Sequence, residues 1–442
     1  MTSSTRSRVI QSKDHFDRIR HMLDHMADNR AYKTTVSRHP AKDPNEVLAE
    51  FKQRFQQYRH NWSSLPQSAC NDKIYGQALK EQKIGPLCID LEMAAICNLV
   101  CPFCYRQHIA TPDKLMHESL WKKAIDQAGQ LGVPSMKFNW RGEPLMHPRL
   151  AEAIARAKGN GIIDTMINTN ALLLDEKTSR KLIEAGLDLM IYSFDGGTAQ
   201  SYERMRVGRF AENSFEAVCR NIKRFNDIRR EMGSVFPRTK IQMLLTKETF
   251  HEQEFFFKLF QDCVDDVSVK AYTERGGSLH DLDPQSQEKL KNFLNRKKLA
   301  HSTAYWRDMH DNISVALGRL PCEQPYQRLM IAYDGRVAMC CYDWGCEHPV
   351  GYLDKRAFER GNRDYEAVQH ASRAGAKGFE KIVNLRMPKP YSAPPLKVES
   401  IEQIWHGGII NCVREKHVSG RSEDIEICRK CPFKETFLWE RI

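Results

Sequence analysis

The segment ICNLVCPFCYR, residues 96–106, holds Cys97, Cys101 and Cys104 in the spacing C-x3-C-x2-C. Three thiolates on one short loop can ligate three irons of a [4Fe–4S] cluster, which leaves the fourth iron open to a small molecule. A structural zinc site usually takes four Cys or His ligands, often from two C-x2-C pairs. His108 is the residue that a zinc interpretation of this loop would need as its fourth ligand.

Composition is typical of a globular protein. The chain has 442 residues, of which 41% are hydrophobic and 28% charged. No apolar run reaches the roughly 18 residues that a membrane span needs. The first residues, MTSSTRSRVIQSKDHF, contain no apolar stretch of the kind found in secretory signals. We therefore expect a cytoplasmic protein with no membrane association.

Charge and cysteine content narrow the chemistry. Fourteen cysteines in a chain expected in a reducing compartment favour metal or cluster ligation over disulfide bonds. The formal net charge of +11 is compatible with a polyanionic partner such as nucleic acid. Basic and acidic residues are interleaved, however, so a solvated basic surface is the simpler interpretation.

Strand-like and helical segments alternate along the middle of the chain. The strand-like segments are 87–93, 135–140, 164–168, 189–194, 240–245 and 267–272, and the helical ones are 120–131, 150–160, 176–185, 211–232 and 252–262. Six strands separated by five helices indicate parallel βα units. We expect an α/β fold, an open or closed barrel with its chemistry on the loops that follow the strands.

The flanking regions have a different character. Residues 1–84 are polar with helical spacing, and Asp283-Pro284 is typical of a helix start. A further domain begins near Cys322 with a hairpin-like stretch at 327–339, whose turn is at Asp334-Gly335. The predicted division is a helical N-terminal extension at 1–84, a barrel at 85–278, a helical linker at 279–318, and a C-terminal domain at 319–442 with an insertion at 354–399.

Three further motifs follow the cysteine loop in order, and with it they resemble the radical S-adenosylmethionine (SAM) superfamily. NWRGEPLMHP at 139–148 contains Gly-Glu-Pro, INTNA at 167–171 lies on the third strand, and YSFDGG at 192–197 lies on the fourth. Arg141 stands where the family often has a first glycine. The resemblance implies a partial (β/α)6 barrel and a SAM site formed by Phe103, Gly142, Glu143, Pro144, Asn168, Ser193, Asp195 and Arg206.

The resemblance also implies a reaction. SAM would chelate the open iron of a [4Fe–4S] cluster held by the three loop cysteines. One electron, from a flavodoxin- or ferredoxin-type reductant, would then release methionine and a 5′-deoxyadenosyl radical, the cofactor carrying the chemistry that the protein orients. The expected target is a substrate C–H bond next to nitrogen or oxygen.

The C-terminal region resembles the SPASM/twitch extension of the same superfamily. It contains a cysteine, a hairpin with Asp-Gly, a second cysteine, a Trp-containing helix and a closing C-x2-C. The resemblance implies one auxiliary [4Fe–4S] cluster with the ligands Cys322, Cys340, Cys428 and Cys431. Cys341 and Cys346 leave the second ligand open, and structural zinc is the alternative for the whole site.

The substrate is the least constrained part of the prediction. The favoured class is a peptide or aminoacyl group, which would undergo oxidation, epimerisation or rearrangement. The alternatives are dehydrogenation or epimerisation of an amino sugar or cyclitol, modification of an amino-acid adduct on a DNA base, and a non-catalytic or activating role. Asp343, close to Cys340, is a candidate base for the substrate radical.

Overall fold

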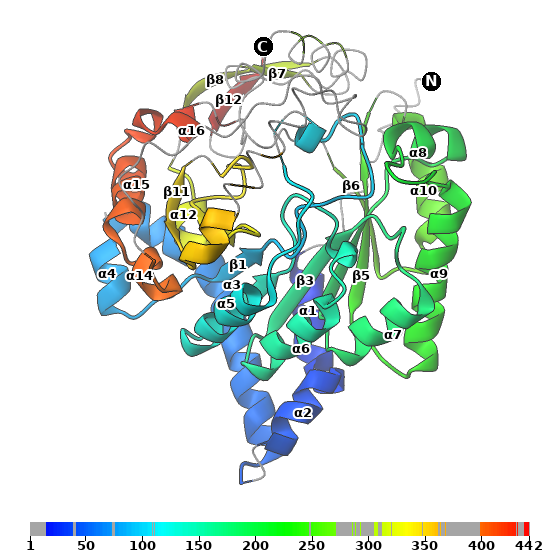
Figure 1. Cartoon of the computed structure of the whole chain (residues 1–442), viewed down its shortest axis with the longest axis horizontal. Coiled ribbons are helices and arrows are strands. Elements are labelled where there is room, and N and C mark those ends of the chain that lie inside the picture. The colour runs from blue at the N-terminus through cyan, green and yellow to red at the C-terminus, as the bar shows by residue number, and fades with distance from the viewer. Residues whose placement is uncertain are drawn as a thin grey trace, which may run out of the picture.

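The computed structural model describes most of the chain (Figure 1). The described residues are 15–38, 41–72, 76–107, 109, 111–246, 249–270, 305–307, 312–319, 321–346, 348–360, 398–429, 431 and 437–441, with 285, 288, 292, 363 and 367 as single positions. Within them, a nine-stranded sheet has the order β11-β10-β9-β1-β2-β3-β4-β5-β6.

The six strands from β1 to β6 are parallel and run in sequence order. They are β1 Cys88–Leu91, β2 Ser135–Lys137, β3 Asp164–Thr169, β4 Leu189–Ser193, β5 Arg238–Leu244 and β6 Asp266–Lys270. This arrangement confirms the α/β prediction, and each strand lies on one of the predicted segments.

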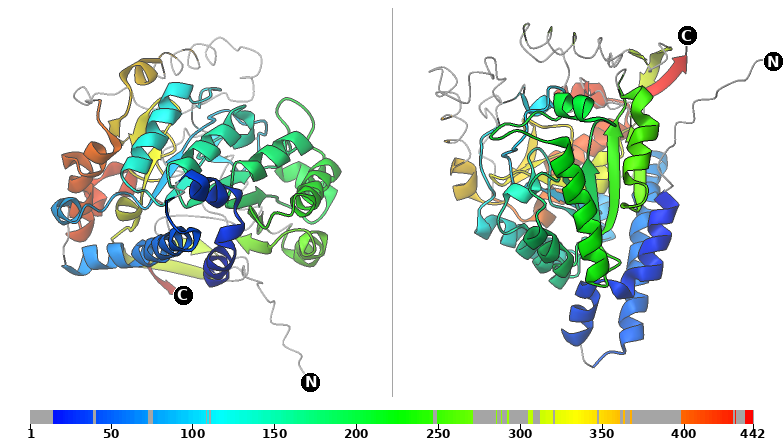
Figure 2. Two further views of the ribbon diagram at one scale, coloured as in Figure 1. Left: turned by 90° about the horizontal axis from the view of Figure 1, so that it is seen from below. Right: turned by 90° about the vertical axis from the view of Figure 1, so that its right-hand side faces the viewer.

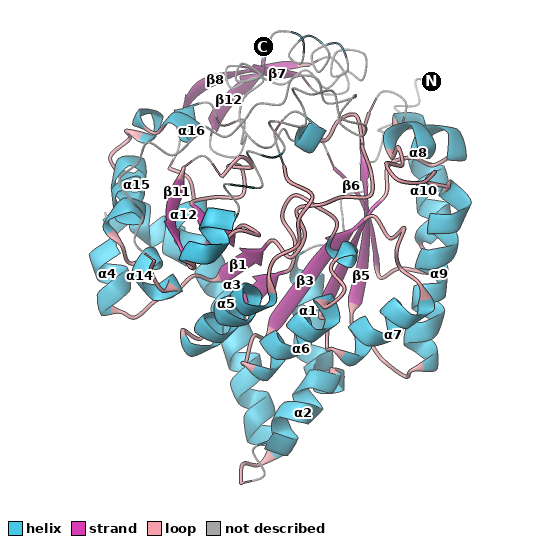
Figure 3. Ribbon diagram, in the orientation of Figure 1, coloured by secondary structure: helices cyan, strands magenta, loops and turns pink. Residues whose placement is uncertain are grey.

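Helices connect these strands and cover the outer face of the sheet (Figure 3). They are α5 Glu118–Gln130, α6 Leu150–Gly159, α7 Glu176–Glu184, α8 Ala199–Met205, α9 Phe215–Glu231 and α10 Gln253–Phe260. The buried face of α5 includes Trp121, which is fully inaccessible. The seven-residue helix α8 was not predicted, because it is too short to show helical periodicity.

The predicted helical extension is present and covers the opposite face of the sheet (Figure 2). It contains α1 His15–His25, α2 Arg30–Arg38, α3 Pro44–Asp72 and α4 Gly76–Glu81. Arg18 of α1 forms a 2.5 Å ion pair with Asp164, the first residue of β3, and Tyr58 of α3 donates to the same carboxylate. The extension thus closes the end of the sheet where the strands begin.

The C-terminal hairpin extends the barrel sheet. It contains β9 Arg328–Ile331 and β10 Arg336–Ala338, and β11 Pro349–Tyr352 pairs with β10. The predicted turn at Asp334-Gly335 is confirmed, and Gly335 has a φ of +84° that favours glycine. Because β9 pairs in parallel with β1, this region shares a sheet with the barrel and has no separate one of its own among these strands.

The predicted helical linker is partly wrong. Within 279–318 the structure has β7 Tyr305–Arg307 and β8 Ile313–Arg319, which pair with β12 Phe437–Arg441 in a three-stranded antiparallel sheet. The partner strand β12 lies far away in sequence, so local patterns could not predict the pairing. Most of the helix predicted after Asp283-Pro284, and most of the 354–399 insertion, lie outside the described residues.

The C-terminal region also contains the helices α12 Gln324–Gln327, α14 Ile401–Trp405, α15 Gly408–Val418 and α16 Glu426–Arg429. Arg414 of α15 is fully buried, with its guanidinium 4.2 Å from the Trp405 ring and its Nε donating to the Pro325 carbonyl. These contacts fix α15 against α12 and α14. Among the described helices, none has the length and apolar character of a membrane span.

Candidate functional site

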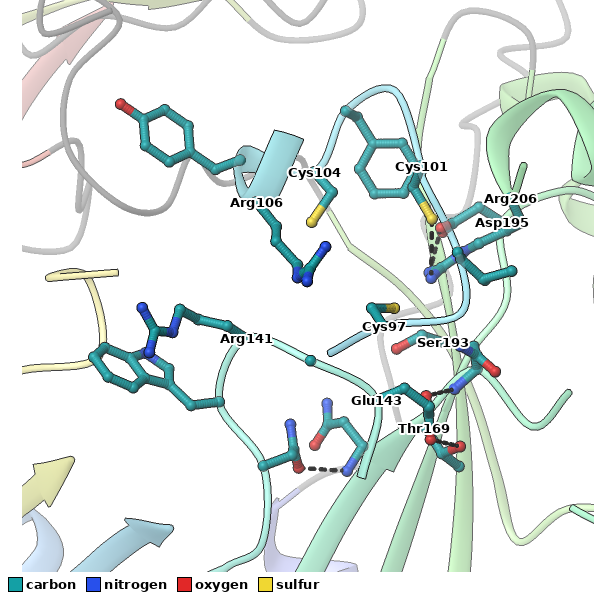
Figure 4. Close-up of a pocket in the computed structure, with 18 of the residues that line it drawn as sticks. Cys97, Cys101, Cys104, Arg106, Arg141, Glu143, Thr169, Ser193, Asp195 and Arg206 are labelled. Carbon is teal, nitrogen blue, oxygen red and sulfur yellow. Dashed lines mark hydrogen bonds and ion pairs between the residues drawn. The ribbon is translucent and has the colours of Figure 1, made fainter. Parts of the chain in front are cut away.

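The loop that follows β1 carries Cys97, Cys101 and Cys104 into one cavity of about 290 Å³ (Figure 4). The cavity lies at the ends of the strands opposite the helical extension. Two backbone contacts hold the loop in place: Val100 N donates to Val207 O at 2.8 Å, and Arg209 Nη1 donates to Cys97 O at 3.4 Å. The three predicted ligands are therefore brought together on one side of a single cavity.

Asp113 anchors the cysteine loop through two arginines. Its carboxylate accepts two hydrogen bonds from Arg209, at 2.8 and 2.7 Å, and one from Arg106 at 2.8 Å. Arg106 is buried, and its Nε also donates to Ala95 O at 3.1 Å. Bidentate and charge-assisted hydrogen bonds of this kind restrict geometry strongly. The loop is thus held rigidly before any cofactor binds.

The thiols themselves lie in a dry environment. Burial raises the pKa of Cys97 to about 11 and that of Cys101 to about 12, although Arg106 and Arg206 lower these pKa values in part. A thiolate is the form that ligates metal, so iron must displace the protons on binding. The described residues contain no group of three His, Cys, Asp or Glu side chains spaced for a single metal ion. Three thiols that line one cavity can together ligate three irons of an iron–sulfur cluster.

Gly142 lies where the Gly-Glu-Pro loop crosses the chain after β1. A Cβ at this position would overlap the carbonyl oxygens of Ala94 and Ile96, so the backbone approach requires glycine. The next residue, Glu143, donates its backbone N–H to Ile96 O at 2.9 Å. Pro144 then begins the short 3-10 helix Pro144–Met146. Gly142 and Glu143 of the motif line the cavity, and the backbone contacts with Ile96 hold them there.

The Glu143 carboxylate connects the loops after β2 and β3. It accepts hydrogen bonds from Thr169 Oγ1 at 2.7 Å, Asn170 N at 2.8 Å and Leu145 N at 3.1 Å. Burial raises the pKa of Glu143 to about 7, while these donors act in the opposite direction. The side chain predicted for cofactor binding is thus already used to shape the site.

Asn168, near the end of β3, presents a free acceptor. Its backbone N–H donates to Asn139 Oδ1 at 2.8 Å, which orients the residue. Its side-chain Oδ1 is buried in the cavity lining and has no hydrogen-bond partner among the residues described. Leaving a buried polar atom unsatisfied is costly, so a donor from a bound molecule fits this position. Ser193 lines the same cavity from the end of β4.

Asp195 and Arg206 connect the cysteine loop to the strands. Arg206 forms a 2.5 Å ion pair with Asp195, whose other oxygen accepts from Leu244 N at 2.6 Å. The same guanidinium lies 5.5 Å from the centre of the Phe103 ring and 3.9 Å from Cys101 Sγ. Of the eight residues predicted for SAM binding, seven line the cavity, and Pro144 lies next to Glu143.

Several residues of the cavity lining were not predicted. They include Lys137 from β2, Gln242 from β5, Lys270 from β6 and Trp344 from the C-terminal region. The alternation of strand side chains could have identified the lysines, because each stands at a strand end. Trp344 could not have been found this way. It is 8% exposed, and its Nε1–H has no partner within the described part of the chain.

The contacts of Arg141 explain why this position has an arginine where the family often has a glycine. It forms an ion pair at 2.6 Å with Glu92, and both side chains have 0% exposure. Arg141 also donates to Trp344 O at 2.7 Å, while Tyr333 N donates to Glu92 at 3.1 Å. Its neighbour Trp140 donates to the carbonyl of Cys341 at 3.1 Å. The arginine therefore joins the barrel to the C-terminal cysteine loop, which a glycine could not do.

The C-terminal cysteines form a second group. Burial raises the pKa of Cys340, and the neighbouring thiols of Cys341, Cys431 and Cys428 raise it further. Burial likewise raises the pKa of Cys322, which also lies close to Cys431 and Cys428. Cys322 and Cys340 thus each have Cys428 and Cys431 among their close neighbours.

Cys341 and Cys346, the two alternatives for the second ligand, have different neighbours. Cys341 Sγ lies 3.6 Å from Gln324 Oε1. Burial raises the pKa of Cys346, and the largest charged neighbours in its surroundings are Arg336 and Asp343. The positions of these side chains favour Cys340 as the member of this group.

Asp343 lies beside the cavity and not in its lining. Its carboxylate is 1% exposed and accepts a hydrogen bond from His348 N at 2.9 Å. Among the described residues, Trp344 lines the cavity but Asp343 does not. The geometry supports a loop-stabilising contact for this aspartate and gives no support to its predicted role as a base.

Comparison with known proteins agrees with this site. Residues 91–259 match the family described as the Radical SAM superfamily. The tungsten-containing aldehyde ferredoxin oxidoreductase cofactor-modifying protein of Pyrococcus furiosus is 30% identical over 166 residues, which are 37% of this chain and 44% of that protein. The PqqA peptide cyclase of Granulibacter bethesdensis is 32% identical over 126 residues, 27% of this chain and 32% of that protein.

The chain spans less than half the length of these curated relatives. Among solved structures, Streptococcus suis SuiB bound to S-adenosylmethionine aligns with a TM-score of 0.40 and 17% identity, over 69% of this chain and 68% of that chain. The matched residues 91–259 include the cysteine loop and the three motif loops that line the cavity. The chain therefore contains a radical SAM domain.

Proposed function

We propose that this chain is an enzyme that cleaves SAM reductively and removes a hydrogen atom from a substrate C–H bond next to nitrogen or oxygen. The observation that carries this proposal is the single cavity shared by the three loop cysteines, Gly142 and Asn168. When bound, the cluster at Cys97, Cys101 and Cys104 supplies the electron that splits SAM into methionine and a 5′-deoxyadenosyl radical.

The protein contributes position and exclusion of water. Arg206, paired with Asp195, holds the cysteine loop against β4. The buried Asn168 Oδ1 is the acceptor we assign to a donor group of SAM, such as its amine or a ribose hydroxyl. Reacting groups held at close range in a dry cavity need less reorganisation to react. These residues therefore act before the chemical step, by fixing the geometry.

For the substrate we favour a peptide or aminoacyl group. The cavity lining includes side chains with N–H donor groups: Lys137, Lys270, Gln242 and Trp344, whose Nε1–H is buried. Such donors match carbonyl and carboxylate oxygens. The cavity of about 290 Å³ would also hold the cluster and SAM, so only a short part of a peptide would enter it.

The contacts of the arginines in the N-terminal extension weaken the case for a DNA substrate. Arg18 forms an ion pair with the buried Asp164, Arg54 donates to Gly161 O at 3.0 Å, and the Arg59 guanidinium lies 4.9 Å from the Tyr58 ring. These arginines of the N-terminal extension are used within the fold. Removing residues 1–84 would also uncover apolar side chains at the start of the strands, so that deletion is no clean test of DNA binding.

We further propose an auxiliary [4Fe–4S] cluster at Cys322, Cys340, Cys428 and Cys431. The proximity of the four thiols supports it. A cluster with four protein ligands has no open iron for the substrate, so its role would be to take up or relay the electron that the substrate radical gives up. We retain the domain boundaries predicted above, except that the hairpin of 319–442 is built onto the barrel sheet.

Anaerobic reconstitution tests both proposals. The wild type should hold about eight irons, corresponding to two four-iron clusters, and should form 5′-deoxyadenosine when SAM and dithionite are added. Replacing Cys97, Cys101 and Cys104 together with Ala should remove about half of the iron and all of this product. Cys263→Ala, at a partly buried cysteine outside both groups, is the control and should change neither. Continued SAM cleavage by the triple variant would refute the proposal.

A further inference from the structure

We infer that His417 donates a hydrogen bond from its Nε2–H to the thiolate of Cys428, and that it thereby raises the reduction potential of the auxiliary cluster. This inference rests on the auxiliary cluster proposed above. Nothing in the sequence motifs assigned a role to His417. Its placement follows from α15 and from contacts with two of the cysteines.

His417 is held in one orientation inside the C-terminal region. It is 2% exposed and lies three residues after Arg414, on the same buried face of α15. Arg414 fixes that face through hydrogen bonds to the carbonyls of Pro325 and Trp405, at 3.0 and 2.7 Å. The imidazole therefore cannot rotate away from its neighbours without disrupting the packing of the helix.

The two ring nitrogens contact two different cysteines. Nδ1 lies 3.2 Å from the backbone N of Cys322, and Nε2 lies 3.5 Å from Cys428 Sγ. The first contact fixes the protonation of the ring. A backbone N–H can only donate, so Nδ1 must be the acceptor and carries no proton. In the neutral ring the proton is then on Nε2, which faces the sulfur.

The same argument excludes His417 as an iron ligand. A histidine that binds a metal through Nε2 keeps a proton on Nδ1 and donates it to a carboxylate, carbonyl or water. Here Nδ1 faces a donor, so ligation through Nε2 would leave the ring without any proton. The Cys322 amide thus selects the donor role for His417 and leaves ligation to the cysteines.

A hydrogen bond to a ligand sulfur changes the balance between oxidation states. The reduced cluster carries one more negative charge, and an N–H donor at the sulfur stabilises that state more than the oxidised one. Removing the donor should therefore lower the reduction potential. A loss of about tenfold in the ratio of reduced to oxidised cluster at a fixed potential corresponds to about 59 mV for one electron.

The test is a redox titration of the reconstituted, two-cluster protein, followed by electron paramagnetic resonance. His417→Leu removes the donor and should lower the ratio of reduced to oxidised auxiliary cluster about tenfold at fixed potential. His417→Gln retains a side-chain N–H and should restore most of it. The control is His406→Leu, which alters a histidine at the end of α14. The potential of the cluster at Cys97, Cys101 and Cys104 should be unchanged in all three variants.

Iron content and a labelled sample separate the outcomes. If His417→Leu retains about eight irons but has the wild-type potential, the inference is wrong while the auxiliary cluster stands. A wild-type protein with about four irons and one zinc would overturn the auxiliary cluster, and this inference with it. If the Leu variant loses iron, pulsed electron paramagnetic resonance of the wild type labelled with ¹⁵N-histidine shows whether a histidine nitrogen ligates the auxiliary cluster. A coupling typical of a ligating nitrogen overturns the inference, and a weak coupling with an exchangeable proton supports it.

Discussion

Replacing Arg141 by Met should destabilise the protein far more than replacing an arginine on the surface. The Arg141–Glu92 pair is completely buried, with two hydrogen bonds of 2.6 Å. Removing the arginine leaves the Glu92 carboxylate without its counter-charge in a region from which water is excluded. Breaking a buried pair in this way costs about 3–5 kcal/mol, and the bond from Arg141 to the carbonyl of Trp344 is lost as well.

Arg149 provides the matched control. It forms ion pairs with Glu118 and Glu152, but its side chain is 39% exposed and its partners are 40% and 46% exposed. Water and salt screen such pairs, so Arg149→Met should cost less than about 1 kcal/mol. The double variant Glu92→Leu with Arg141→Met should recover much of the lost stability, because it removes both buried charges.

Urea unfolding of the metal-free protein measures all four variants, single and double, against the wild type. The expected order of midpoints places Arg149→Met close to the wild type, the double variant below it, and Arg141→Met or Glu92→Leu lowest. A cost below about 1 kcal/mol for Arg141→Met would refute the argument, because it would show that Glu92 is not held as a buried charge.

Three further outcomes are expected. Gly142→Ala should weaken SAM binding to the iron-loaded protein at least about tenfold, or about 1.4 kcal/mol, as measured by equilibrium dialysis. The control is Gly408→Ala, whose Cβ would meet nothing within 4 Å and which should leave SAM binding unchanged. The folded-state pKa of Glu143, raised to about 7, lies above the ordinary value of 4.5, so the folded state binds a proton that the unfolded state has released. Stability should therefore fall as pH rises through that interval, and urea midpoints of Glu143→Gln should lack this component; an unchanged pH profile would contradict it. Cys428→Ala should lose about half of the iron but retain 5′-deoxyadenosine formation, with the exposed Cys412→Ala as control.

The sequence was sufficient to predict the parallel strands because each combines an apolar run with turn residues at its ends. It also identified the loop of Cys97, Cys101 and Cys104, where ligand spacing is a local property. Following the alternation of side chains to the ends of β2 and β6 would also have identified Lys137 and Lys270 as cavity residues.

The features that the sequence did not predict depend on contacts between different segments of the chain. Strand β8 is stabilised by β12, more than a hundred residues further along the chain, so its own residues gave no adequate signal. The Arg141–Glu92 pair and the contact of His417 with Cys428 join different elements in the same way. A single sequence contains the partners of such contacts but not their proximity, which packing decides.

The parallel pairing of β9 with β1 has a consequence for electron transfer between the two cysteine groups. Strand β1 leads directly into the loop of Cys97, and β10, the next strand after β9, leads into Cys340. Backbone hydrogen bonds across one sheet, together with the bond from Arg141 to Trp344, therefore fix the separation of the two cysteine groups. A linker between mobile domains would let that distance vary, whereas a shared sheet does not. Electron transfer between two clusters placed here would then depend on their potentials, which His417 adjusts, and not on movement of one domain against the other.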